Sequence, residues 1–443
     1  MSNITITPGR GAAKYQIAVF GGLITVLLCS GCASPPTVPR HELERVGWQV
    51  RTRLEDQSLP FWTSRRLLKD AYRGFLPVLD ESLEPTGDTT RNMVVYLRGV
   101  YGFAVGVNHG RLGLERKRMS DELDRRLAYL ASNYWDSEAG GFLWELNSAG
   151  IPAGLHKGTL GQVYAIYVLA ETYRLTQRAE ALDLARRTFA VVDATGHDTS
   201  HGGYLANYER SPESDENRVK SGGLQMHMML ALATLYGVDP KPVYRERLEE
   251  LLKILTDRFE IPNSGGNAYY ALERDWSVIP ADDSLNTTTC YAHNAELVWY
   301  AYEAVRVLGR DAADFLPWMS RLTEAILENG VSKDGAVFFT GPYRGRATNQ
   351  TVYWWAQSEA MIVLLRMYEL TGQIRYWNNF HRVWDWTQRY MIIDDSGAWV
   401  AFVDGDGKRL SEFRTGGNWK AGLHAIRALS MCDVMLQRLL NTR

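Results

Sequence analysis

Apolar and amphipathic windows alternate along most of this chain. Four windows are apolar nearly all round a helical wheel, at residues 160–175, 224–236, 293–308 and 355–370. Each is followed by a window with one polar face, at residues 180–192, 242–259, 312–329 and 375–390. A helix that is apolar on all sides is buried, whereas an amphipathic helix meets solvent on one side. The pattern therefore predicts pairs of helices, with an inner helix covered by an outer one.

A short glycine signature recurs between these pairs, at intervals of about 65 residues. In each copy a glycine precedes an aromatic and apolar run, and the copies begin at Gly74, Gly141, Gly203, Gly266, Gly335 and Gly397. Polar turn residues precede several copies, so the signature predicts a short β-hairpin. Six copies predict six repeats of one structural unit.

Six helix pairs that close on themselves form an all-α (α/α)6 barrel with its short β-hairpins at one end. An open solenoid is the alternative, but its end repeats should carry polar caps. Because no Pro/Gly/Ser-rich linker interrupts residues 41–443, we expect one barrel domain over that range. The ends of the inner helices would then line a central cleft.

The N-terminus has the pattern of a bacterial targeting segment. Basic residues precede an apolar run at residues 17–28, which is too short to span a bilayer and suits a signal peptide. The run ends in Leu28-Cys29-Ser30-Gly31-Cys32, which resembles a lipoprotein box. We expect a signal peptide over 1–32, a lipidated Cys32 and a tether over 33–40. Ala33 after the cysteine favours the periplasmic face of the outer membrane in the cell envelope.

Bulk composition narrows the partners. A net charge of −2 gives no electrostatic reason to expect nucleic acid, or a membrane surface other than through the lipid anchor. Beyond Cys32 only Cys290 and Cys432 remain, too few for a disulfide framework. The sequence shows no nucleotide-binding loop and no metal-ligand spacing, so we expect neither a cofactor nor a metal. The 14 Trp and 23 Tyr are typical of a large core or of a carbohydrate groove.

Three of the nine histidines fall on or beside predicted inner helices. They are His227, His293 and His424. Carboxylates, tryptophans and one arginine share those helices: Arg98, Glu296, Trp299, Trp355, Glu359 and Trp419. An indole offers a flat apolar platform for a sugar ring, and an imidazole can take or give a proton near pH 7. We therefore expect the three imidazoles to converge in one cavity that binds a mono- or oligosaccharide.

Five motifs in the same order resemble the N-acylglucosamine 2-epimerase superfamily, which includes the cellobiose 2-epimerases. The motifs lie at 59–76, 220–227, 292–299, 354–372 and 419–427. The central one, Ala292-His293-Asn294-Ala295-Glu296-Leu297-Val298-Trp299, is similar to the family's Gly-His-x-x-Glu-x-x-Trp. Departures from the family pattern include Gly223, Leu224 and Leu230, where relatives commonly carry Asn, a polar residue and Glu.

The resemblance implies a sugar 2-epimerase that works through an enediolate. In that family reaction His293 and His424 exchange the proton at C2, and His227 hydrogen-bonds a sugar oxygen. Arg98 stabilises the enediolate, Glu296 and Glu359 orient neighbouring groups, and the tryptophans pack on the sugar.

Three alternatives stay open at this point. If one histidine moves the proton between C2 and C1, the enzyme is an aldose-ketose isomerase. The same barrel also hosts glycan hydrolases and lyases, and a hydrolase needs two opposed carboxylates. A non-catalytic glycan-binding lipoprotein of the envelope is the third reading.

Overall fold

The computed structural model describes residues 37–64, 79–80, 83, 91–109, 115–206, 217–280, 283, 287–410 and 420–442, together with two short strands, β1 (Val19–Phe20) and β2 (Leu23–Ile24). The rest of the predicted signal peptide, Cys32, residues 33–36 of the tether and the first glycine signature lie outside the described residues. In the described part of the chain, no helix has the length and apolar character that crossing a membrane requires.

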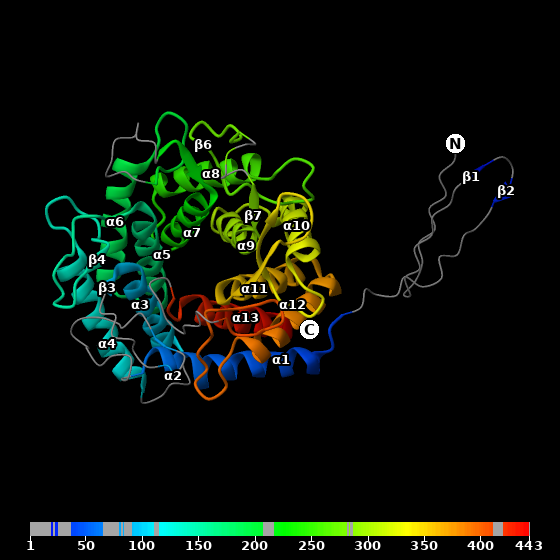
Figure 1. The fold of residues 1–443 in the computed structure, drawn as a ribbon, viewed down its shortest axis with the longest axis horizontal. Coiled ribbons are helices and arrows are strands. Elements are labelled where there is room, and N and C mark those ends of the chain that lie inside the picture. The colour runs from blue at the N-terminus through cyan, green and yellow to red at the C-terminus, as the bar shows by residue number, and fades with distance from the viewer. Residues whose placement is uncertain are drawn as a thin grey trace.

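Of the described helices, six surround the centre of the ring in Figure 1. They are α3 (Met93–Asn108), α5 (Thr159–Thr176), α7 (Gly222–Val238), α9 (Tyr291–Val307), α11 (Trp354–Thr371) and α13 (Leu423–Asn441). Each contacts the next, and α13 contacts α3, so the ring closes. The predicted (α/α)6 barrel is confirmed, and the open solenoid is not.

Each inner helix packs against one outer helix. The outer helices are α4 (Glu115–Tyr129), α6 (Ala179–Gly196), α8 (Pro242–Arg258), α10 (Leu316–Ala325), α12 (Ile374–Tyr390) and α1 (Arg40–Thr52). The sixth pair joins the two ends of the chain, because α1 packs on α13. Burial follows the predicted pattern: α3 is buried on every side from Met93 to Val107, whereas α1 buries one stripe only.

Four short helical segments extend these helices. Two are π-helical continuations of outer helices, η3 (Leu130–Tyr134) after α4 and η7 (Ile326–Gly330) after α10. A third π-helical segment, η1 (Arg53–Ser58), joins α1 to the short α2 (Leu59–Trp62).

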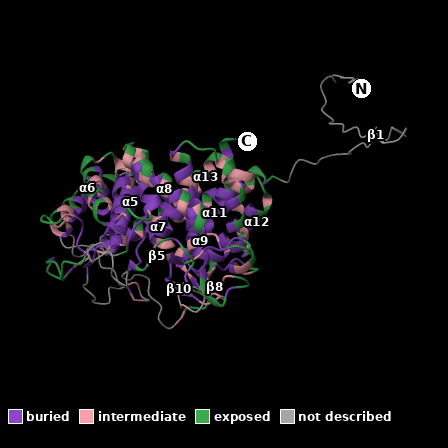
Figure 2. Ribbon diagram, turned by 90° about the horizontal axis from the view of Figure 1, so that it is seen from above, coloured by how far each residue is buried: buried purple, intermediate pink, exposed green. Residues whose placement is uncertain are grey.

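The glycine signatures form the predicted hairpins. In five described copies a residue before the turn pairs with one just after the glycine: Trp135 with Phe142, His197 with Tyr204, Glu260 with Ala268, Val331 with Val337 and Ile392 with Trp399. The strands gather below the helices in Figure 2, at one end of the barrel. Two of these turns explain why the residue is glycine. Gly266 and Gly335 have positive φ, and a Cβ there would lie 2.1 and 2.3 Å from a backbone oxygen of α10 and α12.

The fourth residue of an inner helix fixes the hairpin that precedes it. Gln162 in α5 accepts from the Phe142 amide at 2.7 Å and donates to the carbonyl of the same residue at 2.7 Å. Gln225 in α7 makes the same pair of bonds with Tyr204, at 2.9 and 2.8 Å. These buried side-chain amides therefore fix the position of each of these two hairpins relative to its inner helix.

Strands close to the barrel mouth lead straight into two inner helices. β7 (Thr288–Cys290), β8 (Phe338–Pro342), β9 (Asn349–Tyr353) and β10 (Phe402–Val403) form an antiparallel sheet in the order β10-β9-β8-β7. β7 continues into α9 and β9 into α11. Two smaller sheets pair β3 (Arg91–Asn92) with β4 (Glu145–Leu146) and β5 (Val219–Ser221) with β6 (Ala271–Glu273).

Candidate active site

One polar side chain occupies the sixth position of five inner helices. They are Arg98 of α3, Tyr164 of α5, His227 of α7, Glu296 of α9 and Glu359 of α11. The sixth helix contributes Arg427, at the fifth position of α13. Because each inner helix begins at the hairpin end, side chains at equal positions lie at similar depth in the barrel. These groups form one polar layer, whose contacts run from helix to helix.

On one side of this layer the contacts run through Tyr164. A nitrogen of Arg98 donates to the Tyr164 hydroxyl at 3.3 Å, and that hydroxyl lies 3.1 Å from His227 Nε2. His227 Nδ1 lies 2.7 Å from the Gly223 carbonyl. A carbonyl only accepts, so Nδ1 carries the ring proton and Nε2 accepts from Tyr164. Both nitrogens of His227 are thus engaged, which suits a hydrogen-bonding role better than proton transfer.

On the other side the layer is built round Arg427, which is 1% exposed. Its guanidinium donates to Glu359 Oε1 at 2.7 Å and lies 3.8 Å from Glu296 Oε1. The Tyr300 hydroxyl donates to Glu296 at 2.9 Å, and Trp299 Nε1 donates to Glu359 Oε2 at 2.8 Å. One buried cation therefore faces two buried carboxylates, and each carboxylate has its own neutral donor.

The two carboxylates titrate in opposite directions. Burial, together with the charge of Glu359, raises the pKa of Glu296 to about 8. Burial also acts to raise the pKa of Glu359, but Arg427 and His424 outweigh it and hold that pKa low, at about 2. At neutral pH the pair therefore favours an ionised Glu359 beside a protonated Glu296.

Nearer the mouth, two histidines flank one tryptophan. His293 is the third residue of α9, and Trp355 and His424 are the second residues of α11 and α13. The Trp355 ring centroid lies 5.3 Å from that of His293 and 6.1 Å from that of His424. His424 Nδ1 lies 2.7 Å from Glu359 Oε1, which directs its other ring nitrogen, Nε2, away from the carboxylate. Among the described residues, the His293 ring has no hydrogen-bond partner.

The three cavity histidines, His227, His293 and His424, share one electrostatic feature. Burial lowers the pKa of each imidazole, to about 3, 4 and 3 respectively. The neighbouring Glu359 acts in the opposite direction on His424. All three rings are therefore neutral at pH 7, the form that a general base needs.

The other residues predicted from the sequence have mixed placements. Arg98 is buried, and its Nε and Nη1 atoms have no partner among the described residues. Trp299 was expected to pack against the sugar, but its indole is 2% exposed and holds Glu359 in place. Trp419 lies outside the described residues. Tyr164, Tyr300 and Arg427 received no role from the sequence, although the sixth-position register singles out Tyr164.

Within the described ranges, one group of acidic and histidine side chains is close enough to hold a metal ion. Ligand atoms of Glu296, Glu359 and His424 lie within 4.8 Å of one another. Arg427 contacts both carboxylates, so its guanidinium supplies the positive charge that a cation would bring. The arrangement is that of an ion-pair network. A second group of histidine and acidic side chains lies in the turn that carries His197 and His201. There Asp198 is paired with Lys220 at 2.8 Å, so a lysine already balances the charge of the carboxylate.

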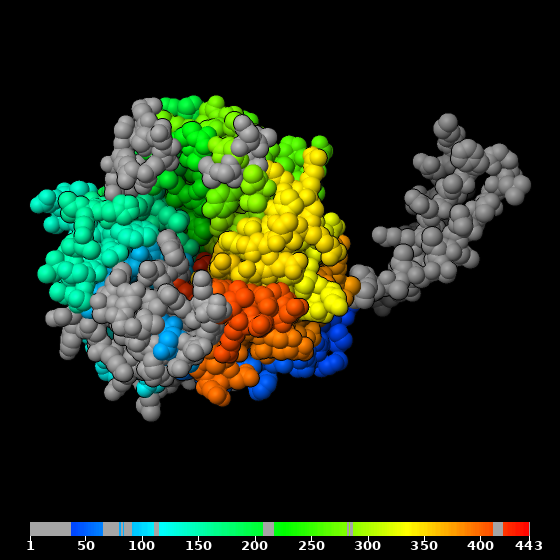
Figure 3. Space-filling model, in the orientation of Figure 1, coloured from blue at the N-terminus to red at the C-terminus, as the bar shows by residue number. Residues whose placement is uncertain are grey.

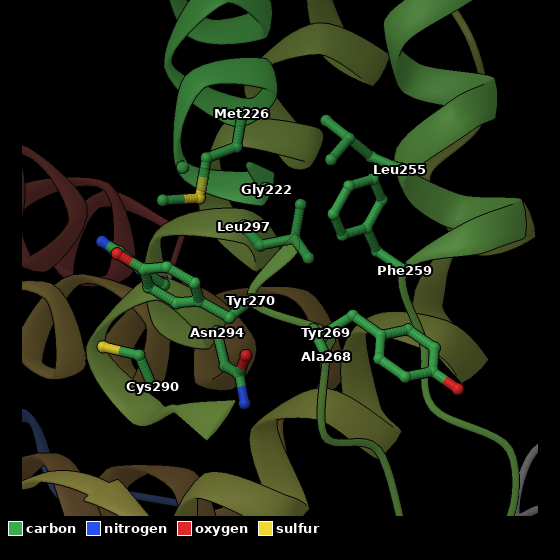
Figure 4. A pocket seen from close by; sticks show the side chains of 12 residues that line it. Gly222, Met226, Leu255, Phe259, Ala268, Tyr269, Tyr270, Cys290, Asn294 and Leu297 are labelled. Carbon is green, nitrogen blue, oxygen red and sulfur yellow. The ribbon is translucent and has the colours of Figure 1, made fainter. Parts of the chain in front are cut away.

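A pocket of about 310 Å³, partly open to solvent, lies beside His293 between α7, α8 and α9. Part of its lining is apolar, with Met226, Leu255, Phe259 and Leu297 (Figure 4). A Cβ added at Gly223 would lie 3.7 Å from His293 Cε1. The departure at Gly223 therefore leaves open the space in which a side chain would face His293. Figure 3 shows the central hollow on the hairpin side, with α13 at its floor.

Comparisons with known proteins identify the family. The family model of N-acylglucosamine 2-epimerase (GlcNAc 2-epimerase) matches residues 74–427. The cellobiose 2-epimerase of Bacteroides fragilis is 25% identical over 402 residues, which cover 88% of this chain and 98% of that protein.

Two solved structures share the fold. The cellobiose 2-epimerase from Spirochaeta thermophila superposes with a TM-score of 0.80 at 23% identity, over 91% of this chain and 100% of that one. A D-mannose isomerase superposes with a TM-score of 0.73 at 17% identity, over 89% of this chain and 97% of that one. Since the family model covers most of the sequence, the chain belongs to the N-acylglucosamine 2-epimerase family of carbohydrate epimerases and isomerases.

Proposed function

We propose that this chain inverts C2 of an aldose, or of the reducing-end unit of an oligosaccharide, by proton transfer between His293 and His424. The observation that carries the proposal is the pair of imidazoles whose ring centroids lie 5.3 and 6.1 Å from that of Trp355. His293 has both ring nitrogens, and His424 has Nε2, available to a substrate. Family membership supports the sugar chemistry.

The first step is removal of the C2 proton from the open-chain aldehyde. A C–H bond beside a carbonyl is a weak acid, so the base must be neutral and the developing charge must be stabilised. If His424 Nε2 takes the proton, its Nδ1–H stays bonded to the ionised Glu359, which stabilises the imidazolium. Arg98, with two nitrogens unpartnered among the described residues, can donate to the enediolate oxygens.

The second step returns a proton to the opposite face of C2. The negative enediolate favours the protonated form of the imidazole that faces it, because an opposite charge nearby raises the pKa of that imidazole. His293, once it has taken a proton from solvent, would deliver it to C2 and return to its neutral form, and His424 would then release its proton to solvent. In the reverse reaction the two histidines exchange roles. The protonated Glu296 and Tyr164 keep His227 neutral as a hydrogen-bonding group below the sugar.

The hydrolase reading loses support from the same geometry. Hydrolases place two carboxylates about 5–9.5 Å apart, on either side of the scissile bond. Ligand atoms of Glu296 and Glu359 lie within 4.8 Å of each other, and Arg427 contacts both. Both carboxylates are 1% exposed or less. Aldose-ketose isomerisation stays the second candidate, since a structural neighbour is a D-mannose isomerase and both reactions share the enediolate.

The test is to incubate the protein in heavy water with glucose, mannose, cellobiose and N-acetylglucosamine and to follow the C2 proton by NMR. We expect inverted product that carries deuterium at C2, and a loss of about 10²–10⁴-fold in rate for both His293→Ala and His424→Ala. A variant that loses only the second proton donor can still exchange C2–H slowly without inversion.

His381→Ala is the control. His381 lies on the outer helix α12 and pairs with Glu42 of α1 and Asp385 of α12, which are also outer-helix residues. It should keep the wild-type rate. Formation of a ketose would show that the enzyme is an aldose-ketose isomerase and not an epimerase. If both site variants kept full rate while Glu359→Gln stopped cleavage of a glycan, the hydrolase reading would be correct.

We also propose that the protein is anchored to the envelope by a lipid on Cys32, on the strength of its N-terminal sequence. Expressed in a Gram-negative host, the chain should fractionate with membranes and incorporate labelled palmitate. Cys32→Ser should abolish both. Unprocessed chain in the cytoplasm would contradict the proposal.

A further inference from the structure

The chain enters the barrel at the end opposite the cavity mouth. Val38 is 1% exposed, and its amide donates to the Tyr368 hydroxyl at 3.4 Å, near the end of α11. Arg40 donates to the carbonyl of Leu440, near the end of α13. Because the inner helices begin at the hairpin end, these contacts place the entry point at the far end, where the C-terminus also lies (Figure 2).

A lipid on Cys32 would hold this end of the barrel close to the bilayer. Val38 is the sixth residue after Cys32, and six fully extended residues span at most about 22 Å. Along α11, the helical rise from Tyr368 back to Trp354 is about 21 Å, and the hairpins lie beyond Trp354. With the mouth against the bilayer, Val38 would stand off by that length plus the height of the hairpins. The connection is too short for that arrangement.

Two exposed apolar side chains lie on neighbouring stretches of α1 and α13. Trp48 of α1 is 64% exposed, and Val434 of α13 is 50% exposed. The two helices pack together, and Arg51 of α1 pairs with Asp433 of α13 at 2.8 Å. Trp48 is one helical turn before Arg51, and Val434 follows Asp433 directly. We call Trp48 and Val434 the α1 patch.

The charged side chains of α1 leave the surroundings of the patch close to neutral. Its three arginines each have an acidic partner: Arg40 with Glu44, Arg45 with Glu42 and Arg51 with Asp433, at 2.9, 2.6 and 2.8 Å. The patch is therefore suited to an apolar contact and not to attraction by an anionic partner.

The chemistry of the patch favours a lipid surface over a protein partner. Tryptophan is enriched at the boundary between lipid headgroups and acyl chains, and a lipid-anchored protein gains stable attachment from a second contact. A stable protein interface buries about 800 Å² on each partner, far more than two side chains supply.

We propose that the α1 patch rests on the bilayer to which Cys32 is attached, and that the cavity mouth opens away from that bilayer into the aqueous phase. The inference rests on the proposed lipid anchor and is independent of the reaction at the site. The short connection determines which end of the barrel lies near the membrane, and the patch determines which side. The protein then takes its sugar from solution, and not from a glycan whose reducing end is fixed to a membrane lipid.

The test measures the height of three labelled positions above the bilayer. The lipidated chain is reconstituted in vesicles of phosphatidylethanolamine and phosphatidylglycerol with an energy-transfer acceptor on the headgroups. Donor fluorophores are attached to Glu44→Cys, Glu246→Cys or Asp406→Cys, and all three positions are exposed. The native Cys290 and Cys432 are buried and should not react.

Glu44 and Glu246 are a matched pair, because each is the fifth residue of an outer helix, α1 or α8. α8 packs on α7, which lies opposite α13 in the ring. We expect the donor at 44 to be nearest the acceptors. The donor at 406, in the turn after β10 at the mouth, should be about 15 Å or more farther away. The donor at 246 should also be farther away than the donor at 44.

Two further variants test the patch itself. Trp48→Ala should reduce the difference between positions 44 and 246 to less than half. Ile151→Ala removes another exposed apolar side chain, in the loop after β4, and should leave that difference unchanged. A rise in ionic strength to about 1 M should also leave it unchanged, because the contact is apolar.

Three results would overturn the proposal. They are a donor at 406 as close to the acceptors as the donor at 44, equal distances at 44 and 246, and a dimer in detergent that Trp48→Ala dissociates. A chain without lipid would refute the anchor and this orientation together. None of these measurements depends on epimerisation, so the proposed function is decided by the heavy-water experiment alone.

Discussion

Replacement of Arg427 by methionine is expected to destabilise the barrel by about 3–5 kcal/mol. The side chain is 1% exposed, and it is the cation that faces Glu359 at 2.7 Å and Glu296 at 3.8 Å. Without it, the ionised Glu359, which is fully buried, keeps Trp299 and His424 as its partners among the described residues. An uncompensated buried charge costs more than the lost bond itself, because its desolvation is no longer offset.

The magnitude is checked by urea-induced unfolding at pH 7. Arg438→Met is the matched control, since Arg438 lies on the same helix and also bridges α13 to α11, through Glu369 at 2.7 Å. Its side chain is 49% exposed, so the expected loss is below about 1 kcal/mol. If the two arginine variants lose equal stability, the reasoning about the buried network is refuted.

A second variant tests the cause. Adding Glu359→Gln to Arg427→Met removes the buried negative charge that Arg427 no longer balances. The amide oxygen of the new glutamine side chain can still accept a hydrogen bond from Trp299. The double variant should therefore be more stable than Arg427→Met alone, by about 2 kcal/mol or more. The loss in Arg427→Met should also shrink between pH 7 and pH 4.5, because Glu359 protonates more readily once the cation is gone. Strictly additive losses would show that the two side chains are not coupled.

Two further predictions concern the whole fold. Unfolding free energy should rise by about 2.7 kcal/mol per pH unit between pH 5 and 6, because unfolding takes up three protons at the cavity histidines and releases one from Glu296. The lowered histidine pKa values destabilise the fold as pH falls below 6.5, while the raised Glu296 pKa works the other way; a flat profile in urea melts would contradict both. Gly335→Ala should cost more than 3 kcal/mol, since its Cβ would lie 2.3 Å from the Arg382 oxygen at positive φ. Gly372→Ala, also at positive φ but with nothing within 4 Å, should cost about 1 kcal/mol in the same thermal and urea melts.

Much of the fold was predictable because the same glycine signature and helix pair recur along the sequence. In two units a left-handed glycine lies where the hairpin touches an outer helix, and Gly266 and Gly335 show why no other residue fits there. The pairing of α1 with α13 was not predictable in the same way. The polar face of α1 indicates an outer helix. The residues of α1 alone do not indicate that it packs against the last helix of the chain.

The candidate site was predictable where a residue type stands out from its helix. Histidines and carboxylates on apolar helices are rare enough to single out His293 and Glu359. Tyrosines are not, because Tyr164 and Tyr300 resemble ordinary core residues in the sequence. The Tyr164 contact with His227 depends on how two neighbouring helices align, whereas Tyr300 contacts Glu296 one turn away on the same helix. Arg427 is the last residue of the family motif at 419–427. Its position between two carboxylates depends on the three-dimensional structure and was not evident from the sequence.

The pairing of the first helix with the last also determines when the barrel can finish folding. Arg40 at the start of α1 donates to the carbonyl of Leu440, 400 residues later. During synthesis the apolar stripe of α1, with Leu43, Val46 and Val50, has no native cover until α13 emerges. The same final segment brings His424 and Arg427. Closure of the barrel and assembly of its proton-transfer pair are therefore a single event, and a nascent chain that stops short is both open and inert.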